Sequence, residues 1–323
     1  MRALQQFRYG QPKSALRLVE LPEPRPGRGE VLVRVAAASV NSWDWDKVVG
    51  SALGRLGAPF ASGRRVLGAD VAGTVLAVGE GVTRFQPGDR VFGDLSEGNW
   101  GGFAEQVAAS EDALAIMPAG IGFVEAAALP QAAALALQAL RLRPSLGAGD
   151  RVLINGAGGG VGTIFVQLAK RLGVHITAVD RAEKLAALQG LGADEVIDYR
   201  RRDFSETAEG YDLIVDVVAN RSVRKFSACL RENGQLVVVG GTVRSLLSVG
   251  LFGASVGKKR GQRLGLLFYR PSPADNVELA EAVVSGSLRP VIDSTFSLSE
   301  GADAVARLGS GGATGKVVIT IDG

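Results

Sequence analysis

The stretch from residue 151 to residue 180, RVLINGAGGGVGTIFVQLAKRLGVHITAVD, constrains the fold more than any other part of the chain. An apolar run is followed by a burst of five glycines, an apolar pattern of helical period, a second apolar run and an acid. Runs this apolar along their length are typical of strands buried on both faces of a parallel sheet. The stretch therefore predicts a strand, a tight turn, a helix and a second parallel strand.

The glycines follow the spacing Gly156-x-x-Gly159-x-x-Gly162, one residue longer in the turn than G-x-G-x-x-G. Glycine lets the chain turn sharply off a strand, lets backbone approach a diphosphate, and lets the helix begin against the sheet. The unpaired N–H groups and the dipole of that helix then face the anion. We predict a dinucleotide cradle here, with a purely structural turn as the alternative. The residues of the predicted cradle are Asn155, Gly156, Gly158, Gly159, Gly160, Val161 and Gly162.

Asp180 ends the second apolar run, where a carboxylate can accept hydrogen bonds from an adenosine ribose. A carboxylate at this place repels a 2′-phosphate, which gives a mild preference for NADH over NADPH. Arg181 and Lys184 follow within one helical turn. They are candidates for holding a 2′-phosphate if Asp180 moves aside, and the alternative is that they are solvated charges at a helix start.

The pattern of apolar residues, glycines and prolines changes twice along the chain. Residues 1–122 consist of short apolar runs between glycine and proline turns, which predicts a compact, partly open β barrel. Residues 123–286 alternate apolar strands with helical patterns, which predicts a parallel sheet covered on both faces. Residues 287–323 return to β texture and are expected to rejoin the first domain. The predicted fold class is α/β, with a β-rich domain and a doubly wound parallel-sheet domain.

Composition excludes several classes of protein. The net charge of +3 is small, and the Lys and Arg residues are scattered, so no nucleic-acid partner is expected. One cysteine, Cys229, and one histidine, His175, cannot assemble a Cys/His zinc site; we interpret them as a buried helix residue and a strand-edge residue. No apolar stretch is long enough to span a membrane, and no signal peptide is recognised, so we expect a cytoplasmic protein.

Several longer motifs extend the pattern beyond the glycine-rich stretch. They are AASVNSWDW, VLGADVAGTVLAVGEGVTRFQPGDRVFG, GGFAEQVA, AAALPQAAALALQAL, NGAGGGVGTIFVQLAK and LGADEVIDY. With these motifs the chain resembles the zinc-independent, quinone-oxidoreductase branch of the medium-chain dehydrogenase/reductase superfamily over essentially its whole length. The resemblance implies a GroES-like catalytic domain, a Rossmann domain and a homodimer.

The same resemblance places further residues near the cofactor. The ends of the fourth and fifth strands of the Rossmann sheet, Val218 with Asn220 and Gly240 with Gly241, are expected near the nicotinamide ribose. Lys316 is expected to approach the cofactor, with an ordinary lysine at a strand edge as the alternative.

Departures from related patterns bear on the chemistry. Zinc alcohol dehydrogenases carry a cysteine in the segment of Asn41 and a His-Glu pair where this chain has Ala69 and Asp70, so no zinc chemistry is expected. Within the zinc-free branch, a threonine often stands where this chain has Leu135, and a tyrosine common after the VN motif is missing. These departures predict an unusually apolar substrate site.

Without a metal, the charge that develops on the acceptor must be met by an amide, a hydroxyl, a backbone N–H or water. Quinones and α,β-unsaturated carbonyls need the least help, because the charge spreads into a quinol or an enolate. Asn41 is the leading candidate for this contact, since its amide both donates and accepts, and the alternative is an asparagine that fixes a turn. Asp44 and Lys47 are candidates for a proton relay; alternatively they form a local ion pair or are solvated.

Three aromatic residues complete the candidate site. Trp43 and Trp45 are candidate pocket walls, together with Leu135, although a core role suits at least one tryptophan equally well. Tyr269, which with Arg270 ends the predicted sixth strand, is a candidate proton donor or else a packed aromatic. The basic, apolar segment 242–265 is left open between a lid, a dimer contact and a membrane-touching helix.

Together these observations predict a metal-free, NAD(P)H-dependent oxidoreductase that reduces a small quinone or α,β-unsaturated carbonyl. A first alternative is a zinc-free alcohol dehydrogenase or ketone reductase. A second alternative is a cofactor-binding regulatory or structural protein with vestigial redox activity.

Overall fold

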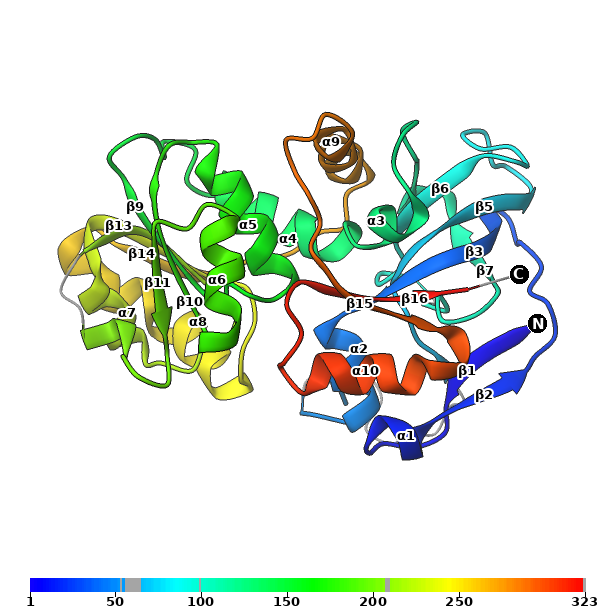
Figure 1. Cartoon of the computed structure of the whole chain (residues 1–323), viewed down its shortest axis with the longest axis horizontal. Coiled ribbons are helices and arrows are strands. Elements are labelled where there is room, and N and C mark those ends of the chain that lie inside the picture. The colour runs from blue at the N-terminus through cyan, green and yellow to red at the C-terminus, as the bar shows by residue number, and fades with distance from the viewer. Residues whose placement is uncertain (53, 56–64, 99, 207–209, 322–323) are drawn as a thin grey trace. The chain divides into compact units, whose positions relative to one another are not determined.

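The computed structural model describes residues 1–52, 54–55, 65–98, 100–206 and 210–321 (Figure 1). The chain forms two compact units, one of Met1–Ala134 with Pro271–Gly323 and one of Leu135–Arg270. The mixture of a β-rich unit and a parallel-sheet unit confirms the predicted fold class.

The division between the units differs from the expected boundaries after residues 122 and 286. Helix α3 (Phe123–Ala127) packs on strands β3 and β5 of the first unit, and helix α9 (Pro273–Val284) packs on strand β8. Both helices therefore join the first unit, although their sequence pattern resembles that of the second. Helix α4 (Pro130–Arg141) runs across the division.

The first unit is built on a seven-stranded sheet of order β15-β16-β3-β5-β6-β8, with β7 also paired to β3. Alternate residues of β3 are buried, and Val31, Val33 and Val35 contribute to one core cluster. Strand β16 pairs antiparallel with β3, so the C-terminal residues belong to this sheet. The strands are β3 (Glu30–Val40), β5 (Asp70–Val78), β6 (Arg90–Asp94), β7 (Gln106–Ser110), β8 (Leu114–Ile116), β15 (Ile292–Ser297) and β16 (Lys316–Thr320).

A second, three-stranded sheet of order β2-β1-β4 and several short helices complete the first unit. Within the described residues the larger sheet is open between β15 and β8, as a partly open barrel would be. The remaining elements are β1 (Arg2–Gln6), α1 (Pro12–Ala15), β2 (Leu16–Glu20), α2 (Ser42–Val49), β4 (Arg65–Val66) and α10 (Gly301–Gly309).

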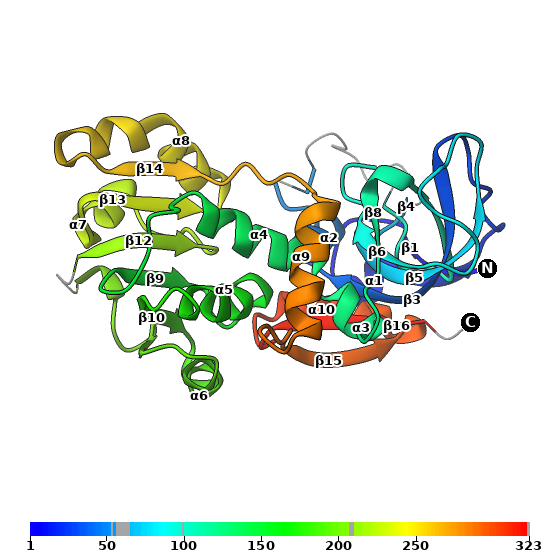
Figure 2. The same cartoon turned by 90° about the horizontal axis from the view of Figure 1, so that it is seen from above.

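The second unit is a six-stranded sheet of order β11-β10-β9-β12-β13-β14, parallel throughout (Figure 2). Strand β9 comes first in sequence but lies inside the sheet, so the chain winds outward in both directions from the β9/β12 pair. In doubly wound sheets, ligands bind at the carboxyl ends of the strands where the winding direction reverses. The elements are β9 (Arg151–Asn155), α5 (Gly160–Lys170), β10 (His175–Asp180), α6 (Ala182–Gly190), β11 (Glu195–Asp198), β12 (Tyr211–Asp216), α7 (Val223–Cys229), β13 (Leu230–Val238), α8 (Val243–Gly257) and β14 (Arg263–Leu266).

Strand β14 corrects one expectation about the sixth strand. It ends at Leu266, so Tyr269 and Arg270 lie beyond it instead of at its carboxyl end. The segment after β13 is also more regular than its composition suggests, because residues 243–257 form the single helix α8. The interpretations of Cys229 as a buried helix residue and of His175 as a residue at the edge of a strand are both confirmed; His175 is the first residue of β10 and is exposed.

Candidate functional site

The glycine-rich turn of the second unit needs its glycines for two separate reasons. Gly156 follows β9 with a φ of 83°, and a Cβ there would lie 2.3 Å from a methyl group of Val217. Gly162, in the first turn of α5, lies so close to the preceding turn that a Cβ would be 2.4 Å from the backbone of Ala157. The first glycine allows the turn, and the second allows the helix to begin against it.

The start of α5 has the properties of an anion site. Its N-cap is Gly159, which supplies no capping side chain. Among the described residues, the first N–H groups of the helix therefore have neither an intrahelical partner nor a cap. A Cβ on Gly159 would meet only the carbonyl oxygen of Gly156, at 3.5 Å. A bare helix N-terminus beside open space fits the diphosphate of a nicotinamide dinucleotide.

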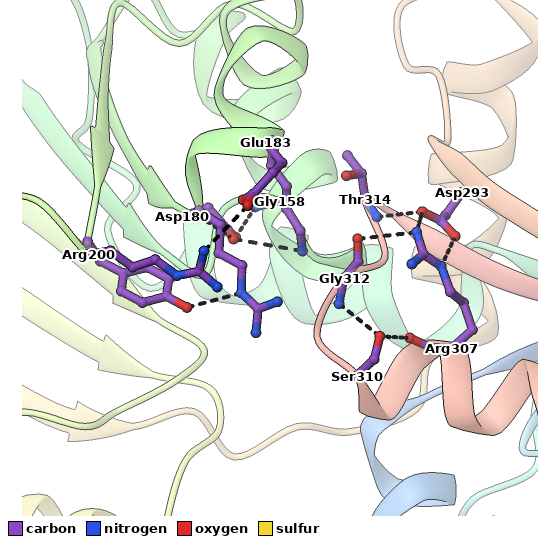
Figure 3. Close-up of polar contacts among 12 residues, drawn as sticks. Gly158, Asp180, Glu183, Arg200, Asp293, Arg307, Ser310, Gly312 and Thr314 are labelled. Carbon is purple, nitrogen blue, oxygen red and sulfur yellow. Dashed lines mark hydrogen bonds and ion pairs between the residues drawn. The ribbon is translucent and has the colours of Figure 1, made fainter.

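Asp180 lies at the end of β10 beside this turn and is only 7% exposed (Figure 3). Its Oδ2 accepts a hydrogen bond of 2.7 Å from the backbone N–H of Gly158, and its Oδ1 accepts one of 2.8 Å from the N–H of Arg181. The Nζ of Lys184, one helical turn later, lies 3.7 Å from Oδ1. Asp180 therefore fixes the glycine turn, and its charge is balanced by a lysine.

The basic residues around Asp180 are not equivalent. Lys184 is 6% exposed, so the alternative of a solvated charge is wrong for it. Arg181 is paired, because its Nε donates to the hydroxyl of Tyr199 at 3.1 Å. Further out, Arg200 and Glu183 form an exposed ion pair of 3.4 Å, also drawn in Figure 3.

The turns after β12 and β13 meet at the same edge of this sheet as the glycine turn. A Cβ on Gly241 would lie 2.5 Å from the Cβ of Ala219, so the two turns are in direct contact. Val218 is exposed, and so is Asn220, which accepts a hydrogen bond from Arg221. The expected cofactor residues Val218, Asn220, Gly240 and Gly241 are thus all placed at the carboxyl ends of parallel strands.

Sequence reasoning missed Asp216, which organises this edge. Its Oδ1 accepts hydrogen bonds from the backbone N–H groups of Val218 and Ala219, at 2.8 and 2.6 Å, and from the side chain of Asn155 at 3.1 Å. Burial raises the pKa of this carboxyl, and the two backbone donors oppose the shift. An acid at the end of the apolar run YDLIVD was the signal that could have found it.

The first unit contains a buried polar cluster where β3, β5 and β16 lie side by side. Asn41 follows β3, and its backbone N–H donates to Oδ2 of Asp44 at 2.8 Å. The N–H of Gly68 donates to Oδ1 of the same carboxyl at 3.0 Å. Asp44 is fully buried; burial raises its pKa to about 7, although both backbone hydrogen bonds oppose the shift.

Lys316 lies at the centre of this cluster. Its Nζ donates to Oδ1 of Asn41 at 2.5 Å and lies 3.5 Å from Oδ2 of Asp70, which also accepts from the hydroxyl of Ser39 at 3.0 Å. Burial raises the pKa of Asp70 to about 6, and the charge of Lys316 opposes that shift. Sequence reasoning singled out Asn41 and Lys316 separately, and missed that Asp70 and Ser39 join them.

Two polar atoms of the cluster have no hydrogen-bond partner among the described residues. They are Nδ2 of Asn41 and Oδ1 of Asp70, both buried. Buried polar groups in native proteins nearly always have a partner, so such atoms mark a place for a ligand or a water. The amide of Asn41 is the one of the two that sequence reasoning assigned to ligand binding.

The remaining residues expected in the substrate site differ in their contacts and in their exposure to solvent. The Nζ of Lys47 lies 4.7 Å from the ring centre of Trp100 and forms no ion pair with Asp44 in the described structure. Burial lowers the pKa of Lys47, and nearby Arg65 adds to the shift. Trp45 packs on the core of the first unit, whereas Trp43 is 51% exposed. Leu135 on α4 and Tyr269 are both half-buried.

Two features of the described residues bear on metals and membranes. No group of three or more His, Cys, Asp or Glu side chains there is arranged to hold a metal ion. None of the described helices combines the length and the apolar character needed to cross a bilayer. The thiol of Cys229 is 1% exposed, and burial raises its pKa to about 11, so it is unreactive at neutral pH.

Comparison with known proteins identifies relatives for the whole chain. The sequence matches the family described as alcohol dehydrogenase GroES-like domain over residues 27–119 and the family described as zinc-binding dehydrogenase over residues 191–319. The chloroplastic quinone-oxidoreductase QR1 of Triphysaria versicolor is 34% identical, over 99% of this chain and 98% of the relative. The chloroplastic NADPH-dependent alkenal/one oxidoreductase of Arabidopsis thaliana is 31% identical, over 92% of this chain and 73% of the relative.

Among solved structures, the quinone oxidoreductase of Coxiella burnetii superposes with a TM-score of 0.89. It is 31% identical, over all of this chain and 99% of that one. Both the fold and the sequence therefore agree over the full length.

The expected cytoplasmic location is contradicted by the same comparisons. Relatives of 34–35% identity from Triphysaria versicolor, Arabidopsis thaliana and Spinacia oleracea are named as chloroplast proteins. The expectation rested on the lack of a recognised signal peptide and of an apolar stretch long enough to span a membrane, and neither feature distinguishes the cytoplasm from a chloroplast.

The predicted class of activity is confirmed, because the relatives carry the names of quinone and alkenal/one oxidoreductases. The proposed absence of zinc stays a prediction. The chain belongs to the medium-chain dehydrogenase/reductase superfamily, in its quinone-oxidoreductase-like branch.

Proposed function

We propose that this protein uses NAD(P)H, with a mild preference for NADH, to reduce a quinone or an α,β-unsaturated carbonyl without a metal. The observation that carries the proposal is the bare N-terminus of α5, where Gly159 leaves open space and no side chain caps the helix. The names of the relatives support the same acceptor classes.

The bound cofactor would supply a hydride, and residues of the second unit would hold it. The N–H groups of the first turn of α5 bind the diphosphate, whereas those of the glycine turn are engaged by Asp180 and by backbone carbonyl groups. Asp180 supports the preference for NADH, because a carboxylate held on the N–H of Gly158 presents negative charge beside a 2′-phosphate. Arg181 and Lys184 work against that preference, although Lys184 is engaged with Asp180.

In the first unit, Asn41 provides the polar contact for the acceptor, and Trp43 contributes apolar surface for a planar molecule. Asp44 holds two backbone N–H groups and is fully buried, so we assign it to the shape of the turn and not to proton transfer. Lys47, Tyr269 and water remain as proton sources. The lowered pKa of Lys47 supports its place among them.

We further propose that the protein is a homodimer that uses the β14 edge and helix α8. In the described structure β14 pairs only with β13, which leaves an edge for a partner strand. Val243, Leu247 and Leu251 recur on one face of α8, and Leu251 is 71% exposed. Leu251→Arg is expected to convert a dimer into a monomer in sedimentation velocity; a wild-type monomer at micromolar concentration contradicts the proposal.

A panel of acceptors tests the catalytic proposal. The purified protein is mixed with NADH or NADPH and with quinones, enones and plain ketones, and the absorbance of the reduced cofactor is followed. Turnover of quinones or enones with inert ketones is the expected result. Turnover of ketones supports a ketone reductase, and cofactor binding without any turnover supports a protein with vestigial activity.

A further inference from the structure

The amide of Asn41 has two orientations, which exchange its one acceptor atom with its donor nitrogen. The Nζ of Lys316 approaches this amide within 2.5 Å. An ammonium group carries three donors and no acceptor. Lys316 is therefore compatible with only one orientation of the amide, the one in which Oδ1 accepts a hydrogen bond from Nζ.

The strand register makes this contact reproducible. Val317 pairs with Val40 in this antiparallel register. Lys316, one residue before Val317, and Asn41, one residue after Val40, are therefore neighbours at the start of β16 and the end of β3. Ser39 pairs with Asp70 on the other side of β3, which brings the balancing carboxylate to the same place. Lys316 is 3% exposed, and a buried ammonium needs such a partner to keep its charge.

The consequence concerns the other end of the amide. With Oδ1 bonded to Lys316, Nδ2 is the group of the Asn41 amide that is left for a ligand. It forms no hydrogen bond of ordinary geometry with the described residues, although the amide helps to lower the pKa of the nearby Asp70 carboxyl. An NH₂ group has two donors, so one N–H can face Asp70 and the other a ligand. The nearby positive charge also draws electron density toward Oδ1, which makes Nδ2–H a stronger donor.

We infer that Lys316 is a positioning residue that makes Asn41 a hydrogen-bond donor toward the substrate. The inference rests on the proposed function and adds to it which chemical group of the substrate is recognised. The group recognised is an oxygen that only accepts, such as the carbonyl of a quinone or an enone. An acceptor that presents a hydroxyl donor to the same amide gains less, because Lys316 already occupies one of the two acceptor sites of Oδ1 and its positive charge opposes a second donor.

The experiment compares variants that alter donor and acceptor groups separately. Lys316→Arg keeps a charged donor. Lys316→Gln combined with Asp70→Asn removes both charges of the pair, so that no buried charge is left unbalanced and the fold is retained. Asn41→Asp keeps an acceptor for Lys316 and removes the donor. Lys13→Gln is the control, since Lys13 forms an exposed ion pair of 2.7 Å with Asp303 in the same unit.

Kinetics with a quinone and an enone give the first measurement. We expect Lys316→Gln/Asp70→Asn and Asn41→Asp each to lower kcat/KM by about tenfold or more, and Lys316→Arg to lower it by less than about threefold. Adding Asn41→Ala to the neutral pair should cause little further loss, because both changes remove the same hydrogen bond. Fully additive losses overturn the inference, because they show that Lys316 and Asn41 act independently. A loss confined to cofactor affinity in a fluorescence titration also overturns it, because it shows that Lys316 acts on the cofactor directly.

Nuclear magnetic resonance of the cofactor-free protein gives the second measurement. The side-chain NH₂ signals of Asn41 are identified by their absence in Asn41→Asp. They should move in Lys316→Gln/Asp70→Asn and stay in place in Lys13→Gln. Unmoved signals overturn the inference. If the wild-type protein reduces no acceptor, the proposed function fails, and these signals still decide whether Lys316 orients the amide.

Discussion

Two buried aspartate–lysine pairs, one in each unit, are built in opposite ways. Asp180 and Lys184 lie four residues apart, with 3.7 Å between the charged groups. Asp70 and Lys316 come from strands far apart in the sequence and lie 3.5 Å from one another. Asp180 has two backbone donors of its own, whereas Asp70 depends on Ser39 and Lys316. The local pair is a support for a turn, and the distant pair holds three strands in one arrangement.

The largest expected effect comes from breaking the distant pair. Lys316→Met should reduce the free energy of unfolding by about 3–5 kcal/mol, because Asp70 is left buried and without its cation. Lys184→Met should reduce it by only about 1 kcal/mol, since the backbone N–H groups of Gly158 and Arg181 still satisfy Asp180. Denaturant titrations measure both values. Equal losses in the two variants contradict the difference described here.

The second prediction concerns the pH dependence of stability and the buried carboxyl of Asp44 in the first unit. The folded-state pKa of Asp44 is raised from 3.8 to about 7, so the native state binds more protons than the unfolded chain between those values. Stability from this group is therefore present below about pH 4 and is lost as the pH rises to about 7, by about 4 kcal/mol in total.

Asp44→Asn should make the decline of stability with pH less steep. A smaller slope should remain from Asp70, whose pKa is raised to about 6, and from Asp216, whose pKa burial also raises. The variant is also expected to be less stable overall, because an amide has one acceptor oxygen for the two backbone N–H groups that Asp44 holds. The measurement is the slope of unfolding free energy against pH. An unchanged slope in Asp44→Asn contradicts the assignment.

The third prediction concerns the open space at the start of α5. Gly159→Ala should weaken binding of NADH and NADPH by about tenfold, because its methyl group occupies the approach to the helix N–H groups. The melting temperature should stay close to that of the wild type, since a Cβ there has only an ordinary contact of 3.5 Å. Gly190→Ala, with no atom within 4 Å of its Cβ, is the control that leaves binding unchanged. Cofactor fluorescence titrations give the affinities, and equal affinity in both variants argues against a diphosphate at this helix.

The smallest expected effect is on cofactor choice. Asp180→Ala should improve NADPH relative to NADH by about threefold to tenfold, because a negative charge near the 2′-phosphate is removed. Michaelis constants for both cofactors measure the ratio. A ratio that stays the same means that Asp180 acts only as a support for the Gly158 turn.

The sequence by itself determined the parts of the protein whose contacts are local. The glycine turn, Asp180 after its strand and Lys184 one turn later all lie within 30 residues, and their spacing fixes which groups meet. The parallel sheet followed for the same reason, since apolar strands alternate with helices along the chain. Tyr269 was misplaced because the apolar run LGLLFY continues past the point where β14 stops pairing with β13.

Only the tertiary structure decided how the buried polar cluster is assembled. Asn41 and Lys316 are 275 residues apart, and no periodic pattern in either segment indicates the other. Their contact depends on the register of β16 on β3, and that of Asp70 on the register of β5 on β3. The packing of α3 and α9 on the first unit is decided in the same way, by the surfaces that strands from distant segments create together.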